Sequence, residues 1–311
     1  MQVPPIIRQL AAAFDEAGGR LYVVGGGVRD HCLGLPARDM DLEIHGLETA
    51  AVGEVLNRFG YAKEVGKSFN VFKLRHEDEE IDVALPRTRR VGGSDPFLGL
   101  PEATRRRDLT INALLYDVLE GQIIDLQGGL DDLRDRVLRE CAPDTFAEDP
   151  LRALRAVRFS ATLGFALAPS LRDLCAAADL SGEPEERLRT EMEKILLSAP
   201  RPGAGLQGLL EVGQLDVVFP GLAALCPEGH AAALDRAVPY RDTLEDDAER
   251  YALMFAAALY PGGAGARRWL ERLRINRIRR RSVRQLIMAL IESLPPLLAG
   301  PADADLRRLA D

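Results

Sequence analysis

The sequence lacks the features that mark several large classes of protein. No apolar run approaches the roughly 20 residues that a membrane helix needs. Residues 1–19 have the spacing of an amphipathic helix and lack the basic flank and cleavage site of a signal peptide. The four cysteines lie far apart without a C-x-x-C pair, which argues against a zinc knuckle and a disulfide scaffold. We therefore expect a cytoplasmic protein with ordinary thiols.

Charge is distributed unevenly along the chain. The 48 acidic residues exceed the 40 Lys and Arg, and the net charge of −8 taken alone argues mildly against a nucleic-acid partner. Residues 267–284, however, contain nine arginines and a single acid, Glu271. Such clustering is typical of a phosphate-binding surface, whereas an ordinary solvated helix face mixes both signs. Both interpretations of this segment stay open.

The spacing of apolar residues changes near residue 140. Before it, aliphatic content and alternation predict four strands, at 21–26, 39–44, 69–74 and 80–85. Two segments there have helical spacing, 47–59 and 108–118.

After residue 140 the apolar residues recur at intervals of three and four. This spacing predicts helices over 150–165, 185–197, 203–215 and 250–259. The predicted fold class is therefore α+β, with a head of a small mixed β-sheet and helices followed by an all-helical neck, body and tail. We place the head at 1–140, the neck at 141–200, and the body and tail at 201–311.

Residues 21–46 read LYVVGGGVRDHCLGLPARDMDLEIHG and begin like a dinucleotide-binding protein. The fingerprint G-x-G-x-x-G fits Gly25 and Gly27, but Asp30 stands in place of the third glycine. This departure disfavours a nicotinamide-dependent oxidoreductase, as does the helical second half.

The acidic strand that follows is more specific. Alternation in DMDLEI places Asp39 and Asp41 on one face of a strand. Neighbouring carboxylates repel each other and are tolerated around a cation, for which Mg²⁺ bound with substrate phosphates fits best. A third oxygen ligand would come from Asp82 in a neighbouring strand or from Glu43 on the same face. The alternative is that both aspartates are turn and solvent residues of an edge strand.

A glycine-rich turn before a two-carboxylate strand suits nucleotidyl transfer. The backbone of the turn can approach a triphosphate, and Arg29 can offset its charge. A pair of metal ions can then activate an attacking hydroxyl and stabilise the leaving pyrophosphate.

Five ordered blocks extend this pattern: GGGVRDHCLGLPARDMD (25–41), RRRDLTINALLYD (105–117), DLQGGLDDLRDRVLR (125–139), EDPLRALRAVRFSATLGF (148–165) and EERLRTEMEKILL (185–197). They resemble, in order, the motifs of class II tRNA nucleotidyltransferases, a family of bacterial CCA-adding enzymes and their poly(A) polymerase relatives. The resemblance covers roughly residues 20 to 220. It implies template-independent addition of nucleotides to the 3′ end of tRNA, with Mg²⁺ as cofactor.

The resemblance also implies residue roles in the first blocks. Asp39 and Asp41 would bind the metals and, with Asp82, form the catalytic set. Arg107 and Asp108 would hold the ribose and recognise its 2′-hydroxyl. Alternatively, Asp108 caps a helix that begins at LTINALLY. The full nucleotide-binding set that the resemblance implies is Gly25, Gly26, Gly27, Arg29, Arg107, Asp108, Asn112, Asp149, Arg152, Arg155 and Arg158.

The block EDPLR would select the base. Asp149 and Arg152 would present hydrogen-bonding edges to cytosine or adenine, with Glu148 setting their orientation. Alternatively, Asp149 is an N-cap before Pro150 at the first helical position. Arg155 and Arg158 are candidates for phosphate or base contacts, or for solvent residues paired with acids.

Two departures from the family pattern narrow the prediction. Many relatives carry a phosphohydrolase domain marked by a His-Asp pair, but here His230 is the only histidine beyond residue 76, so we expect no hydrolytic metal site. Full CCA-adding members also carry a longer flexible segment where this chain has only residues 86–104. Relatives without it add two cytidines, which favours CC addition.

The predicted partners are tRNA and CTP, with ATP if the enzyme completes CCA. The 267–284 segment would contact the tRNA backbone through Arg274, Arg277, Arg279, Arg280 and Arg281. The alternatives are a complete CCA-adding or an A-adding enzyme and, in another class, a catalytically silent RNA-binding protein.

Overall fold

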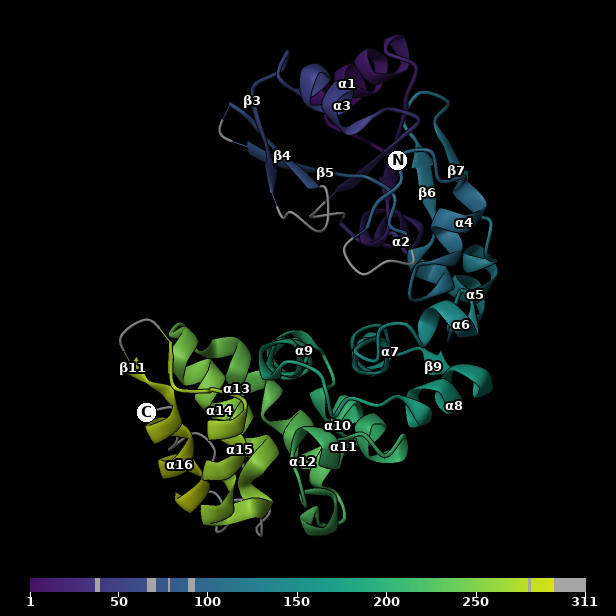
Figure 1. Ribbon diagram of the computed structural model, residues 1–311. Helices are drawn as coiled ribbons and strands as arrows, with labels where there is room; N and C mark the ends of the chain where they lie inside the picture. Colours follow the sequence, from purple (N-terminus) through teal and green to yellow (C-terminus); the bar gives the residue numbers. More distant parts are fainter. Residues whose placement is uncertain (37–39, 66–70, 78, 89–92, 279–280, 294–311) are drawn as a thin grey trace. The chain divides into compact units, whose positions relative to one another are not determined.

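The chain folds into two compact units, Met1–Asp149 and Pro150–Asp311, which are described separately (Figure 1). The computed structural model describes residues 1–36, 40–65, 71–77, 79–88, 93–278 and 281–293. The predicted boundaries at residues 140 and 200 stay predictions.

The first unit is built on a seven-stranded mixed sheet. Its strands are β1 (Arg20–Val24), β2 (Asp41–His45), β3 (Tyr61–Val65), β4 (Val71–His76), β5 (Glu79–Ala84), β6 (Leu115–Asp117) and β7 (Gln122–Ile124). They lie in the order β3-β4-β5-β2-β1-β6-β7. Every neighbouring pair is antiparallel except β2 and β5, which are parallel.

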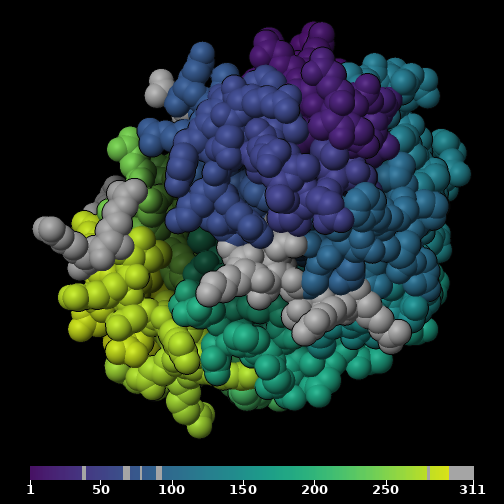
Figure 2. All heavy atoms as spheres, turned by 45° about the horizontal axis from the view of Figure 1, so that its top comes forward, coloured from purple at the N-terminus to yellow at the C-terminus, as the bar shows by residue number. Residues whose placement is uncertain are grey.

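Short helices accompany this sheet. They are α1 (Pro5–Glu16), α2 (Gly26–Cys32), α3 (Thr49–Leu56), α4 (Leu100–Arg105), α5 (Gly129–Asp135) and α6 (Pro143–Phe146), with the 3₁₀ turn η1 (Thr110–Asn112) and the short strand β8 (Val137–Leu138). Helices α1 and α3 lie side by side (Figure 1). The purple and indigo atoms of this N-terminal part form a continuous surface in Figure 2.

The two faces of the sheet differ in polarity. Alternation along β2 places Leu42 and Ile44 on one face of the sheet. Leu42 is in register with Val83 of β5, and Val83 is in register with Phe72 of β4, so Phe72 lies on the same face. Helix α3 covers this face, because a Cβ added at its Gly53 would lie 3.5 Å from the Phe72 ring. Asp41, Glu43 and His45 occupy the opposite face. A helix therefore covers the apolar face, and the opposite face carries the polar residues of β2.

One predicted element of the first unit is wrong. The segment 108–118 forms η1 and then β6, which pairs with β1, instead of a helix. Leu109, Ile111, Leu114 and Leu115 are all buried, so apolar residues occur on every side of this segment and their spacing does not distinguish a helix from a strand. The predicted strands are present with shifted ends, whereas β3, β6 and β7 were not predicted.

The second unit is largely helical, and the predicted α+β fold class is confirmed. Its helices are α7 (Arg152–Leu163), α8 (Pro169–Ala177), α9 (Glu185–Ser198), α10 (Pro202–Glu211), α11 (Leu215–Val218), α12 (His230–Arg236), α13 (Val238–Thr243), α14 (Asp247–Leu259), α15 (Ala266–Arg272) and α16 (Val283–Ser293). The remaining short elements are η2 (Ala223–Leu225), η3 (Tyr260–Gly265), β9 (Ala166–Leu167), β10 (Arg277–Ile278) and β11 (Arg281–Ser282). Within the described ranges, none of these helices has the length and hydropathy to cross a membrane.

Candidate active site

The glycine turn after β1 opens onto a cavity. Gly25 has a φ of +68°, a left-handed conformation that glycine adopts without strain, and its N–H donates to Leu114 O at 3.2 Å. Helix α2 begins directly afterwards, at Gly26. The cavity has a volume of about 470 Å³ and is lined by Gly26, Gly27, Arg29, Asp30, Leu35, Pro36 and Asp41. The turn and the acidic strand therefore share one cavity.

Asp41 and Asp82 lie next to each other in the sheet. The parallel register pairs Leu42 with Val83 and Glu43 with Ala84, which sets Asp41 beside Asp82 one position earlier. Both side chains are exposed, and Asp82 Oδ1 forms an ion pair with Lys73 Nζ at 3.2 Å. Asp39 lies outside the described residues.

The donors on this face fit a hard divalent cation. Asp41 lines the cavity, and the side chain of Asp82 is exposed. Carboxylate oxygens are the ligand type that Mg²⁺ prefers. Glu43 differs, because its side chain is buried and both of its oxygens are engaged within the protein. Among the described residues, no three His, Cys, Asp or Glu side chains are already gathered as a metal site.

Arg29 is held at the cavity from two sides. Its Nη1 donates to Asn112 Oδ1 at 2.7 Å, and its Nε donates to Asp30 Oδ1 at 2.8 Å. Asn112 Nδ2 in turn donates to Asp108 Oδ1 at 3.0 Å. Asn112 and Asp108 are each only 7% exposed. This chain of contacts connects α2 to the RRRD block, and no helix begins at Asp108 for it to cap.

Arg107 is fastened to the sheet through β2. Its Nη2 donates to Glu43 Oε2 at 2.5 Å, and the other oxygen of Glu43 contacts His45 Nε2 at 2.9 Å. Burial alone would raise the pKa of Glu43, but the charges of Arg107 and His45 outweigh burial and hold that pKa below its ordinary value. A Cβ added at Gly25 would lie 3.7 Å from Arg107 Nη1, so the guanidinium lies beside the glycine turn.

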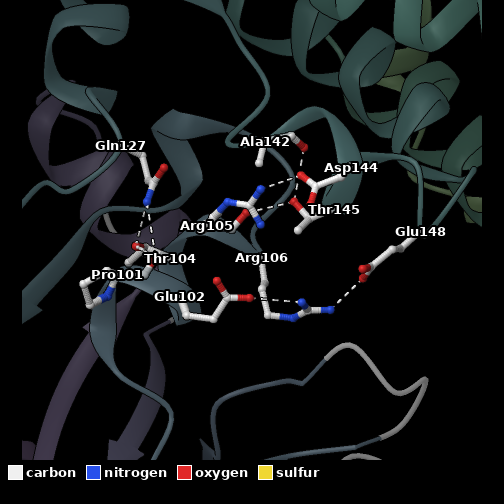
Figure 3. Close-up of polar contacts among 10 residues, drawn as sticks. All are labelled: Pro101, Glu102, Thr104, Arg105, Arg106, Gln127, Ala142, Asp144, Thr145 and Glu148. Carbon is white, nitrogen blue, oxygen red and sulfur yellow. Dashed lines mark hydrogen bonds and ion pairs between the residues drawn. The ribbon is translucent and has the colours of Figure 1, made fainter.

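The first two arginines of the RRRD block face α6 and the residues after it (Figure 3). Arg105 Nη2 contacts Asp144 Oδ1 at 2.6 Å, and this hydrogen bond lowers the pKa of Asp144. Arg106 lies between Glu102, at 3.2 Å, and Glu148, at 2.6 Å. The RRRD block therefore holds the EDPLR block through Glu148, one residue before Asp149.

Helix α7 begins at Arg152 with Leu151 as its N-cap, so Asp149 is not the N-cap residue. Along α7, Arg158 Nε donates to the buried Glu191 Oε2 at 2.7 Å, and its guanidinium lies 4.1 Å from the centroid of the Phe159 ring. Arg155 lies 5.8 Å from the same ring centroid. Arg158 is thus paired with an acid, but its side chain is largely buried, and its contact with the nucleotide stays a prediction.

The arginine-rich segment gains acidic partners from elsewhere in its unit. Arg281 Nη1 lies 3.2 Å from Asp246 and 2.7 Å from Glu249, and Arg274 lies 3.9 Å from Glu185. Arg277 in β10 is exposed. Arg279 and Arg280 lie outside the described residues.

The contacts of Glu43 and His45 with Arg107 and Leu98 were not predicted. A signal for them was present, because alternation in DMDLEIHG places Asp41, Glu43 and His45 on one face of β2. The sequence does not indicate that Arg107 contacts this face, because 64 residues separate Arg107 from Glu43.

Comparison with known proteins identifies two domain families. Residues 21–139 match the Poly A polymerase head domain, and residues 164–226 match the domain described as a probable RNA and SrmB-binding site of polymerase A.

A relative from Pasteurella multocida, a multifunctional CCA protein, is 44% identical over 222 residues, which are 66% of this chain and 50% of the relative. The chain thus spans about half the length of the curated relatives it matches.

Solved structures show the same fold over almost the whole chain. A CCA-adding enzyme of Thermotoga maritima complexed with tRNA has a TM-score of 0.75 at 24% identity, covering 99% of this chain and 78% of that one. A tRNA-processing enzyme in an apo form has a TM-score of 0.71 at 28% identity, covering 96% and 87%. With the motif order and the sheet in agreement, the chain belongs to the class II tRNA nucleotidyltransferases, the family of CCA-adding enzymes and poly(A) polymerases.

Proposed function

We propose that this protein is a template-independent tRNA nucleotidyltransferase that adds CMP to the 3′ end of tRNA. The observation that carries the proposal is the shared cavity, where Asp41 lies with the glycine turn and Arg29. A triphosphate in that cavity would be close to backbone N–H groups, a guanidinium and a carboxylate. These are the parts that nucleotidyl transfer requires.

In the proposed reaction, the 3′-hydroxyl oxygen of tRNA attacks the α-phosphorus of CTP. A new P–O bond forms, the bond between the α-phosphorus and the oxygen bridging to the β-phosphate breaks, pyrophosphate leaves, and the hydroxyl proton passes to water. Asp39, Asp41 and Asp82 would hold Mg²⁺, which supplies charge neutralisation and a more acidic hydroxyl. Between the two candidates for the third carboxylate we favour Asp82, because the oxygens of Glu43 are already engaged.

The remaining side chains of the site would bind and orient the nucleotide. Arg29, braced by Asn112 and Asp30, would contact the phosphates. Arg107 and Asp108 would recognise the ribose 2′-hydroxyl, since a buried polar site rejects a ligand that lacks the matching group. Asp149 and Arg152 would select the base, with Arg106 fixing Glu148 beside them in sequence. Arg155 and Arg158 stay candidates for further contacts.

CC addition is the finer part of the proposal. It rests on the short segment 86–104, where fully CCA-adding relatives carry a longer flexible one. The name of the curated relatives, multifunctional CCA protein, favours the alternative of complete CCA addition.

Sequencing the 3′ end formed on a tRNA that lacks CCA, with CTP and ATP supplied together, tests the proposal. A product ending in CC supports CC addition. A product ending in CCA supports the alternative, and no extension would contradict nucleotidyl transfer. Substrates that already end in C or CC, given each nucleotide separately, identify an A-adding enzyme.

A further inference from the structure

Glu43 is an uncommon residue for the interior of a β-sheet. It is 5% exposed, it lies in the centre of β2, and its partners on both sides are charged or polar. A buried carboxylate costs stability unless its hydrogen bonds are satisfied. Here both oxygens are satisfied, one by Arg107 and the other by His45. The arrangement leads from the sheet to a residue of the proposed nucleotide site.

His45 is itself fixed from two directions. Its Nε2 contacts Glu43 Oε1 at 2.9 Å, and its Nδ1 contacts Leu98 O at 3.1 Å. Each ring nitrogen of His45 therefore faces an oxygen acceptor, one from a carboxylate and one from a backbone carbonyl. The Tyr22 ring packs edge-on against the imidazole, with ring centroids 5.5 Å apart.

The same end of β2 also holds the backbone of the segment before α4. The N–H of Gly46 donates to Pro96 O at 2.7 Å, close to the contact of His45 with Leu98 O. The carbonyl of Leu98 is thereby connected to Glu43 through His45, and Glu43 is connected to Arg107. Arg107 lies at the end of this chain of contacts, beside Gly25.

We infer that Glu43 and His45 are positioning residues, which hold the Arg107 guanidinium in the orientation that recognises the ribose of the incoming nucleotide. This inference rests on the proposed function, because it assigns a task within the same site. Neither residue contacts substrate in this role, and neither is a metal ligand. An arginine side chain is long and flexible, and a charge-assisted hydrogen bond to a fixed, buried carboxylate oxygen orients it far better than solvent does. Without Glu43, the guanidinium loses the charge-assisted hydrogen bond of its Nη2.

The test compares incorporation of CMP from CTP and of dCMP from dCTP into a tRNA that lacks CCA. For Glu43→Gln we expect the KM for CTP to rise about tenfold and the preference for CTP over dCTP to fall about tenfold, with kcat changed less than about threefold. His45→Gln keeps one donor to Glu43 and should show the same changes at about threefold.

Asp117→Asn is the matched control. Asp117 is a second buried carboxylate of the sheet, on β6, and it pairs with Arg20 at 2.9 Å. It pairs in register with Tyr22, as Glu43 does from the other side. We expect Asp117→Asn to lower the thermal unfolding temperature without changing the KM or the ribose preference. Equal kinetic changes in both variants would mean that loss of sheet stability, and not the position of Arg107, is responsible.

A folded Glu43→Gln protein with unchanged KM and unchanged ribose preference would overturn the inference. If Glu43→Gln does not fold, His45→Gln decides in the same way. Failure of the proposed function is distinguishable, because the unaltered protein would then incorporate neither CMP nor dCMP.

Discussion

The arginines of the two units are held in different ways. In the first unit, Arg29 and Arg107 lie beside the glycine turn and are braced by the buried side chains of Asn112 and Glu43. In the second unit, Arg281 is paired with exposed acids of the α14 region, and Arg272 donates to the carbonyl of Val217. A run of arginines in a sequence therefore does not by itself establish an excess of positive charge in space, because the fold brings acids to Arg274, Arg281 and Arg284.

Of the effects that bear on this comparison, the largest separates these two groups of arginines. Arg29→Ala removes the guanidinium that lines the cavity, and we expect kcat/KM for CTP to fall by about 10- to 100-fold, as for a lost charge-assisted contact. Arg281→Ala is the control and should change kcat/KM less than about threefold, because its partners are acids of its own unit. Steady-state kinetics on a tRNA without CCA measures both. Equal losses would remove the distinction between the units.

A smaller effect should follow from breaking the ion pair between Arg106 of the RRRD block and Glu148 of the EDPLR block. Arg106→Glu places a negative charge against Glu148, and we expect the ratio of CTP to ATP incorporation to change about tenfold. The double variant Arg106→Glu with Glu148→Arg restores opposite charges and should recover most of the ratio. If the double variant gives the same ratio as Arg106→Glu alone, Arg106 does not act through Glu148.

A still smaller effect concerns tRNA affinity. Arg277 is exposed in β10, whereas Arg281 is paired with acids. The slope of log affinity against log salt is negative. We expect Arg277→Ala to make it less steep by about 1 and Arg281→Ala to leave it nearly unchanged. Filter binding of tRNA at several salt concentrations gives both slopes. Unchanged slopes in both variants would contradict a contact between this segment and the tRNA backbone.

The smallest expected effect is on stability. His230 is buried, and burial holds its pKa below the ordinary value of 6.5 although Nε2 contacts Ala258 O. Its contribution to stability is complete above pH 6.5 and is lost as the pH falls, because the unfolded chain binds the proton first. Urea unfolding should show a loss on the order of 1 kcal/mol between pH 7.5 and 5.5. The same loss in His230→Gln would contradict this assignment.

The sequence predicted the parts of the fold in which its patterns are simple. The helices of the second unit follow a regular spacing of three and four, and the alternation in DMDLEI predicted the two faces of β2. The segment 108–118 was predicted wrongly because it is buried on all sides and its spacing is ambiguous.

For the candidate site, the residue types were predictable and their contacts were not. The blocks indicated Arg29, Arg107 and Asp108, but nothing in them indicates that Asn112 bridges Arg29 and Asp108 or that Glu43 holds Arg107. The contacts of Arg29 with Asn112 and of Arg107 with Glu43 join residues that are distant in the chain. The acids that pair with Arg281 were missed for the same reason.

The central claim is that the face of the sheet carrying Asp41 forms part of an active site for nucleotidyl transfer. Asp41→Asn keeps the size of the side chain and removes its charge at the cavity. CMP incorporation into a tRNA without CCA should fall at least about 1,000-fold, while tRNA affinity stays unchanged. Incorporation within threefold of the unaltered protein would contradict the account.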